Sequence, residues 1–160
     1  MFFKRRKIKR EKIEETKKKM LELFKNNIDN SDNYNLVYGY HKEFFNEIGD
    51  FIYTSLVIGY DLKNLELIII STDKDFSRVQ NIIRLTKKDF TKAIFSKNLE
   101  EYIIYFNKKK QDKISFSLIT KNYIDIDILA FIEQESEVED FKDFYQDFKR
   151  IPRFKRRKEK

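Results

Sequence analysis

The first 28 residues carry apolar side chains at a helical spacing. Residues 5–28 contain neither Gly nor Pro, and Ile13, Met20, Phe24 and Ile28 fall near one face of a helix. The polar residues 29–33 then favour a turn. This pattern predicts one amphipathic helix, which ends at the polar cluster.

After residue 33 the apolar spacing changes to a period of two, which is typical of strands. Two of the connections, 61–64 and 108–112, have the length and polarity of hairpin loops. In the run after residue 112, Ile114, Phe116 and Leu118 alternate with serines, so one side of the sheet faces a core and the other faces water. The runs predict seven strands: Tyr34–Tyr40, Phe51–Tyr60, Leu65–Ser71, Asn81–Leu85, Thr91–Phe95, Tyr102–Asn107 and Lys113–Ile119.

A helical period returns near the end of the chain. Between Gln134 and Arg150, apolar residues recur at steps of three and four among acidic and basic ones, which predicts an amphipathic helix laid on the sheet. Pro152 ends this helix. Residues 123–128 alternate Ile with Asp or Tyr, and periodicity leaves open whether they form an eighth strand or begin the helix.

A length of 160 residues corresponds to a single domain with appended elements. We expect an α+β chain that is mainly β and has three parts. Residues 1–30 form a basic amphipathic helix, residues 31–150 form the β domain with its C-terminal helix, and residues 151–160 form a basic tail.

Seven strands in meander order followed by one helix resemble the pleckstrin-homology-like (PH-like) barrel of small bacterial proteins. The resemblance is carried by the runs 56–61 and 65–70, and then by 89–93, 102–106 and 113–116. It implies two orthogonal antiparallel sheets whose open corner is plugged by the helix. It also implies a binding module without chemistry of its own, which recognises a lipid headgroup, a peptide or another protein.

Lipid-binding members of that family place basic residues in the first hairpin loop. In this chain the run 42–47 has one lysine against two glutamates, and the loop 61–64 has one lysine against one aspartate. No binding residue of the family can therefore be assigned here.

Charge is concentrated at the two ends of the chain. Residues 1–25 and residues 149–160 each have a net charge of +7, which leaves −7 for residues 26–148 out of a total of +7. The 25 lysines and two alanines are typical of an AT-rich coding bias, which does not explain where the arginines fall. Seven of the nine arginines lie in the ends, namely Arg5, Arg6, Arg10, Arg150, Arg153, Arg156 and Arg157.

Most metal and thiol chemistry is excluded by composition, because the chain has no cysteine and His41 is its only histidine. His41 is expected to be a surface residue or a hydrogen-bonded structural one, with Glu43 or Glu47 as the partner that acid–base work would need. The three glycines are too scattered to cradle a phosphate, and we expect them to mark bulges or tight turns. We predict no catalytic residue, no metal site and no cofactor.

One carboxylate pair keeps an enzymatic alternative open. Asp125 and Asp127 would share one face of a strand and could hold Mg²⁺, as in a divergent nucleotidyltransferase. Those enzymes also need a Gly-Ser phosphate loop upstream, and residues 115–123 contain no glycine. An ordinary exposed strand face is the competing interpretation.

The basic ends carry the functional hypothesis. Each joins phenylalanine to a run of cations, and the candidate binding residues are Lys4, Arg5, Arg6, Arg10, Arg153, Arg156 and Arg157. Such runs bind acidic proteins, anionic membrane surfaces or nucleic-acid phosphate, and they also act as solubilising ends. The sequence has neither a signal peptide nor a membrane-spanning run, so we expect a cytoplasmic protein.

These observations predict a non-enzymatic binding or adaptor module. Its basic termini would contact an acidic protein or the inner membrane face, where it would be peripherally attached. The alternative is a nucleic-acid- or ribosome-associated protein. The oligomeric state stays open, because the apolar stripe of the first helix could pack on its own domain or on a second copy.

Overall fold

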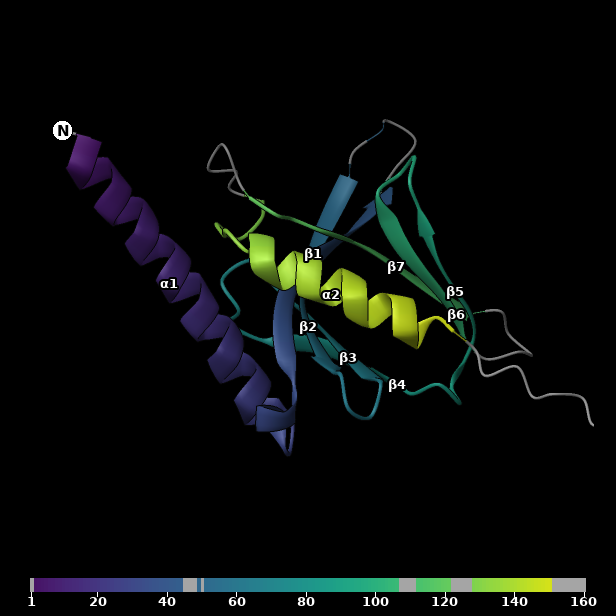
Figure 1. The fold of residues 1–160 in the computed structure, drawn as a ribbon. Coiled ribbons are helices and arrows are strands. Elements are labelled where there is room, and N and C mark those ends of the chain that lie inside the picture. The colour runs from purple at the N-terminus through teal and green to yellow at the C-terminus, as the bar shows by residue number, and fades with distance from the viewer. Residues whose placement is uncertain (1, 45–48, 50, 107–111, 122–127, 151–160) are drawn as a thin grey trace, which may run out of the picture.

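The computed structural model describes residues 2–44, 49, 51–106, 112–121 and 128–150. Two helices and seven strands make up these ranges (Figure 1), together with a short 3₁₀ turn at Ser31–Asn33. Their bounds are α1 (Phe2–Asn27), β1 (Asn35–Phe44), β2 (Phe51–Asp61), β3 (Glu66–Thr72), β4 (Val79–Leu85), β5 (Phe90–Ser96), β6 (Glu101–Phe106), β7 (Asp112–Leu118) and α2 (Glu135–Phe148).

The two predicted helices and seven predicted strands are all confirmed, and the chain is α+β and mainly β. The largest boundary difference is in β1, which runs on to Phe44 rather than ending at Tyr40. The hairpin at 61–64 is confirmed between β2 and β3. The predicted loop at 108–112 and the possible strand at 123–128 fall mostly outside the described residues.

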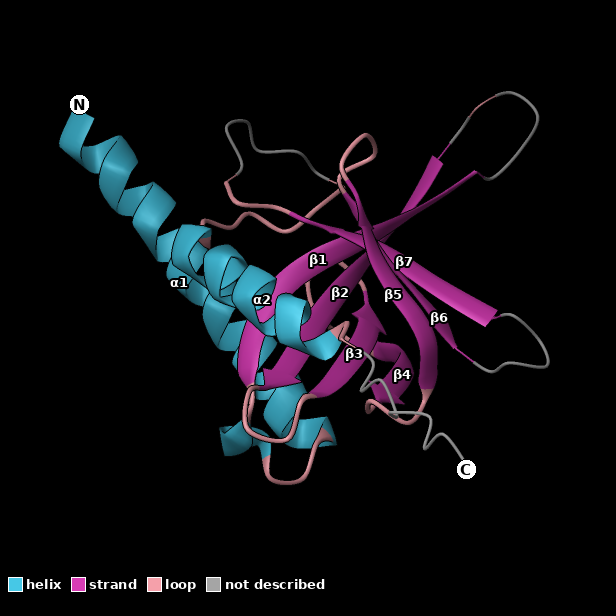
Figure 2. Cartoon of the chain, turned by 45° about the vertical axis from the view of Figure 1, so that its right-hand side comes forward, coloured by secondary structure: helices cyan, strands magenta, loops and turns pink. Residues whose placement is uncertain are grey.

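All seven strands belong to one antiparallel sheet in the order β4-β3-β2-β1-β7-β6-β5. The sheet bends sharply between β1 and β7 (Figure 2), where only two register pairs join the strands, Gly39 with Leu118 and Tyr40 with Ser117. Because β4 and β5 are the first and last strands of this order, they form the two edges of the sheet.

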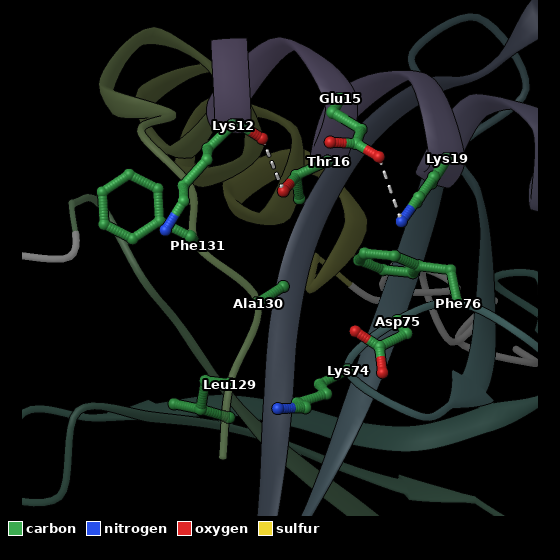
Figure 3. Close-up of a pocket in the computed structure, with 10 residues that line it drawn as sticks. All are labelled: Lys12, Glu15, Thr16, Lys19, Lys74, Asp75, Phe76, Leu129, Ala130 and Phe131. Atoms are coloured by element: carbon green, nitrogen blue, oxygen red, sulfur yellow. Dashed lines mark hydrogen bonds and ion pairs between the residues drawn. The ribbon is translucent and has the colours of Figure 1, made fainter. Parts of the chain in front are cut away.

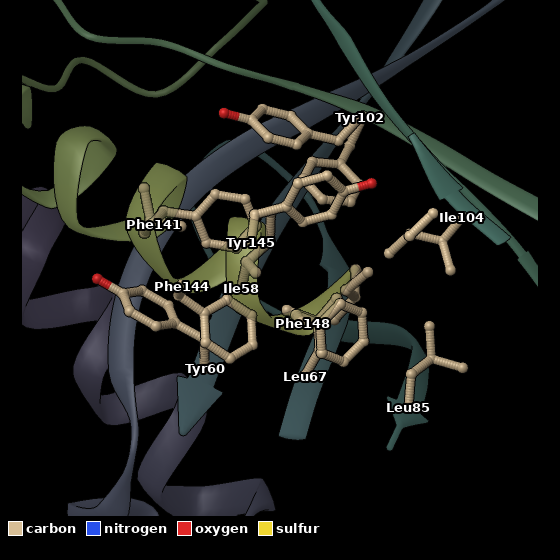
Figure 4. Packing of buried hydrophobic residues seen from close by; sticks show 14 of the residues in the cluster. Ile58, Tyr60, Leu67, Leu85, Tyr102, Ile104, Phe141, Phe144, Tyr145 and Phe148 are labelled. Atoms are coloured by element: carbon tan, nitrogen blue, oxygen red, sulfur yellow. The ribbon is translucent and has the colours of Figure 1, made fainter. Parts of the chain in front are cut away.

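The main core lies between α2 and the concave side of the bent sheet. Phe141, Phe144, Tyr145 and Phe148 project from one face of α2 into a cluster of aromatic and aliphatic side chains (Figure 4). The hydroxyl of Tyr145 donates a hydrogen bond to the carbonyl oxygen of Ile94 at 2.7 Å. The helical spacing predicted for this segment is therefore the spacing of a buried stripe.

A second core lies on the opposite side of β1, β2 and β3. Met20 and Phe24 of α1 pack there against Tyr38, Val57 and Ile68. The central strands are therefore buried on both faces, which explains why the residues of β3 from 67 to 70 are all apolar. Of the two possibilities left open by the sequence, α1 packs on its own domain.

Two glycines do not play their predicted roles. Gly39 and Gly59 lie within unbroken strand register, whereas the register shifts occur in β3–β4 at residues 71–72 and in β5–β6 between residues 90 and 92. The expectation of bulges or turns at these two positions is wrong. Both sit instead where other atoms approach closely, and a Cβ on Gly39 would lie 2.9 Å from the carbonyl oxygen of Ser117.

Candidate anion-binding surface on the first helix

The first third of α1 extends beyond the sheet on which the rest of the helix packs (Figure 1). Residues 4–8 are exposed, and the first fully buried side chain of the helix is that of Met20. We call residues 4–10 the basic segment. It contains Ile8, which is 51% exposed, and six cations, Lys4, Arg5, Arg6, Lys7, Lys9 and Arg10.

The remainder of α1 fixes the direction in which the basic segment projects. Met20 and Phe24 are buried against the sheet, and the Nζ atom of Lys17 lies 2.8 Å from Oε1 of Glu137 in α2. At the end of the basic segment and just after it, Nζ of Lys9 and Nζ of Lys12 lie 6.0 and 5.7 Å from the centre of the Phe131 ring. The helix is thus held from Lys9 onward by contacts with the body.

No carboxylate forms an ion pair with the basic segment within the described residues. Further along α1, Lys17 and Lys19 form ion pairs, whereas no ion pair in the described ranges includes a cation of residues 4–10. The first turn of α1 also contains no acidic residue. Positive side chains therefore surround the positive end of the helix macrodipole, where negative ones would stabilise it.

The cations of the basic segment point to all sides of the helix. Successive residues are rotated by about 100°, so Arg5 and Lys7 lie on nearly opposite sides, and so do Lys4 and Arg6. Residues four apart are neighbours, which places Arg5 beside Lys9 and Arg6 beside Arg10. Like charges at this spacing destabilise a helix by about 0.2–0.5 kcal/mol per pair. A bound anion would relieve that repulsion.

A small polar pocket adjoins this surface where α1 meets the loop after β3 and residues 129–131. Its volume is about 170 Å³, and Lys12, Lys19 and Lys74 line it together with Glu15 and Asp75 (Figure 3). Nζ of Lys19 lies 3.4 Å from Oε1 of Glu15, so part of the positive charge is already neutralised. The pocket extends the cationic surface along α1 but holds fewer uncompensated charges than the basic segment.

Four of the candidate binding residues lie together in the described structure, and three do not fall within it. Lys4, Arg5, Arg6 and Arg10 all belong to the basic segment. Arg153, Arg156 and Arg157 lie outside the described residues, as do the side chains of Phe2 and Phe3. The start of α1 and the end of α2 are well separated in both overall views (Figures 1 and 2).

His41 has a structural arrangement. Its Nδ1 lies 2.7 Å from the carbonyl oxygen of Ser115, and its Nε2 lies 3.0 Å from Oε1 of Glu43. The ring thereby links β1 to β7 just beyond the last register pair of these strands. This confirms the expectation of a hydrogen-bonded structural histidine, whose partners are the Ser115 carbonyl and Glu43.

The other candidates for chemistry lie elsewhere or form no cluster. Asp125 and Asp127 fall outside the described residues. Among the residues that the structure does describe, no group of three or more histidine or acidic side chains could hold a metal ion. Sequence reasoning missed Phe131, because nothing in the sequence indicates that a residue more than 100 positions away faces Lys9 and Lys12.

No helix within the described ranges is both long enough and apolar enough to cross a membrane. The chain was compared with protein-family models, with curated proteins and with solved structures, and none of the three comparisons gave a match.

Proposed function

We propose that this chain is a non-enzymatic binding module that contacts an anionic partner through the basic segment of α1. The observation that carries the proposal is a segment of six cations, of which Lys4–Lys7 project beyond the body, with no ion-pair partner among the described residues. Keeping so many like charges close together costs free energy, and an anionic partner compensates that cost.

The proposal includes a PH-like β domain as the scaffold. Three features support this assignment: seven consecutive antiparallel strands, a sharp bend between β1 and β7, and a C-terminal helix that fills the concave side. In this scheme the β domain anchors α1 and sets its direction, while the cations make the contact. The protein would act in the cytoplasm, on an acidic protein, the inner membrane face or a nucleic acid.

Retention on heparin tests whether the basic segment binds polyanions at all, because heparin offers dense negative charge without a lipid or a base. The test variant replaces Lys4, Arg5, Arg6 and Lys7 by Ala, which keeps the helix propensity high. The matched control replaces four exposed lysines elsewhere, Lys18, Lys25, Lys63 and Lys97. Residues 151–160 are identical in all three proteins, so differences in retention report on the substituted positions.

We expect the test variant to elute at a clearly lower salt concentration than the native chain and the control to elute close to the native chain. Equal shifts for the two variants would show that only the total charge matters, which would refute a specific role for the basic segment. Unchanged elution of the test variant would refute it as well.

A further inference from the structure

We infer that the anionic partner of the basic segment is double-stranded DNA, with the helix lying in the major groove. This inference rests on the proposed function and specifies the class of partner. It follows from three properties of residues 4–10: how their charges are distributed around the helix, how wide the helix is, and how unfavourable its charges are without a partner.

The distribution of charge fits a partner that encloses the helix. Among the exposed residues at the start of α1, Lys4 and Arg5 lie on one half of the helix surface and Arg6 and Lys7 on the other, with the centres of the two pairs about 160° apart around the axis. A groove with phosphates along both walls can contact both sides at once. A flat anionic surface can contact only one of them.

A membrane surface also requires an apolar stripe that enters the interface, opposite a charged face. Within residues 4–10 the single apolar side chain is Ile8, and it is flanked by Lys7 and Lys9. The apolar stripe of α1 begins further along the helix and is already used, because Met20 and Phe24 are buried against the sheet. Residues 4–10 therefore lack such a stripe of their own, and the vesicle measurement below tests whether Phe2 and Phe3, which precede them in the sequence, supply the apolar contact.

The dimensions select DNA over RNA. An α-helix with its side chains is about 10–12 Å wide, and the major groove of B-form DNA is about 12 Å wide. The major groove of an RNA duplex is too narrow and deep to admit a helix. The seven residues of the basic segment span about 10 Å along the axis, enough to reach phosphates on both sides of one groove.

The energetics of the free helix favour the same partner. Arg5–Lys9 and Arg6–Arg10 are like-charge neighbours, and the first turn has no acidic residue to offset the helix dipole. Phosphates on both walls of a groove would reduce repulsion on every side of the helix. Binding is therefore expected to make residues 4–10 more stably helical as well as to release counterions.

Two variants that lose the same charge from opposite sides of the helix distinguish binding in a groove from binding to a flat surface. The first replaces Lys4 and Arg5 by Ala, and the second replaces Arg6 and Lys7 by Ala, so each loses one arginine and one lysine from opposite sides of the helix. The control replaces Lys18 and Lys25, two exposed lysines further along α1. Thermal unfolding followed by circular dichroism verifies that all three remain folded.

Binding is measured by fluorescence anisotropy with a labelled 20-base-pair DNA duplex, with a 20-nucleotide single strand, and by co-sedimentation with vesicles containing 30% phosphatidylglycerol. We expect both opposite-side variants to bind the duplex about tenfold or more weakly at 0.1 M salt. The slope of log K against log salt should fall by about 0.9 for each phosphate that a variant no longer neutralises. The control should match the native chain, and the single strand should bind more weakly than the duplex.

Loss of affinity in only one of the two opposite-side variants would contradict the groove, and so would equal binding of single and double strands. Binding to the vesicles without binding to the duplex would replace DNA by a membrane as the partner. If heparin retention depends on the basic segment but the duplex does not bind, the choice of DNA is wrong while the proposed function stands. If heparin retention does not depend on it, both are wrong.

Discussion

The ring of Phe24 lies directly over Gly59, so that a Cβ at position 59 would stand 2.4 Å from the Cε2 and Cζ atoms of the ring. Gly59 is paired with Leu36 on one side and with Ile68 on the other, which fixes its backbone in the middle of the sheet. The absent side chain thus creates the space in which α1 docks. The direction of the basic segment depends on this contact.

Replacing Gly59 by Ala should therefore destabilise the fold. The added methyl group forces the Phe24 ring away from the sheet, and overpacking of this kind typically costs about 1–3 kcal/mol. The free energy of unfolding, measured by urea denaturation, should fall by an amount in this range. An alanine that leaves stability unchanged would show that the ring of Phe24 can move aside without cost.

A double-mutant cycle assigns the cost to this one contact. In a Phe24→Ala background the ring is gone, and Gly59→Ala should then be nearly neutral. The Phe24→Ala substitution alone should cost about 3–5 kcal/mol, because it empties a fully buried aromatic site. If Gly59→Ala is equally costly in both backgrounds, the cause lies in the strand and not in the packing of α1.

Gln134 provides a second test of the fold. Its Oε1 accepts a hydrogen bond from the backbone N–H of Tyr38 at 2.8 Å, and its Nε2 donates to the carbonyl oxygens of Tyr38 and Ile119 at 2.7 and 2.6 Å. The side chain thus takes the place of a neighbouring strand next to β1. Gln134 is only 2% exposed, so water cannot easily replace these bonds.

Gln134→Ala should lower the free energy of unfolding by about 1–3 kcal/mol or more, since it leaves buried backbone groups without partners. The control is Gln146→Ala, which removes an exposed glutamine from the same chain. Thermal unfolding of both variants gives the comparison. Similar midpoints for the two would indicate that the backbone of β1 finds other partners.

The Lys17–Glu137 ion pair should make the stability of the fold depend on pH. Partial burial raises the pKa of Glu137, but the hydrogen bond and the charge of Lys17 outweigh this effect and hold the pKa below its usual value. A carboxylate with a lowered pKa stabilises the folded state above its unfolded pKa of about 4.3. That contribution is lost as the pH falls through the folded value.

Glu137→Gln should therefore reduce stability at pH 7 and have a smaller effect at pH 3. The reduction should not exceed about 1 kcal/mol, since both side chains are more than 30% exposed. Glu135→Gln is the control, because it also removes an acid from the first turn of α2. The urea midpoints of both variants are compared with those of the native chain at pH 7 and at pH 3. If both variants lose stability with the same pH dependence, the effect comes from the helix dipole and not from the Lys17–Glu137 pair.

The order of elements in this fold could be predicted from the sequence because each element has its own apolar period. The unbroken apolar run of residues 67–70 required burial on both faces, and α1 and α2 provide it. The end of β1 was missed because His41, Lys42 and Glu43 interrupt the apolar alternation while their backbone continues to pair with β2.

Contacts between distant segments could not be predicted. Gln134 and Tyr38 are 96 residues apart, and nothing local distinguishes this glutamine from Gln146. The role of Gly59 depends on a ring from another element, whereas the sequence predicts only a bulge or a tight turn there. The cations of the candidate site were found because local charge density shows in the sequence. The position of Lys9 over Phe131 could not be predicted, because these residues are far apart in the sequence.

Amide hydrogen exchange with and without a heparin dodecasaccharide tests the central claim most directly, because it locates the contact along the chain. If the basic segment binds the polyanion, the amides of residues 4–10 should exchange more slowly in the complex. The amides of the central strand β3 should exchange at the same rate with and without it. Unchanged exchange in residues 4–10 at saturating polyanion would contradict the account.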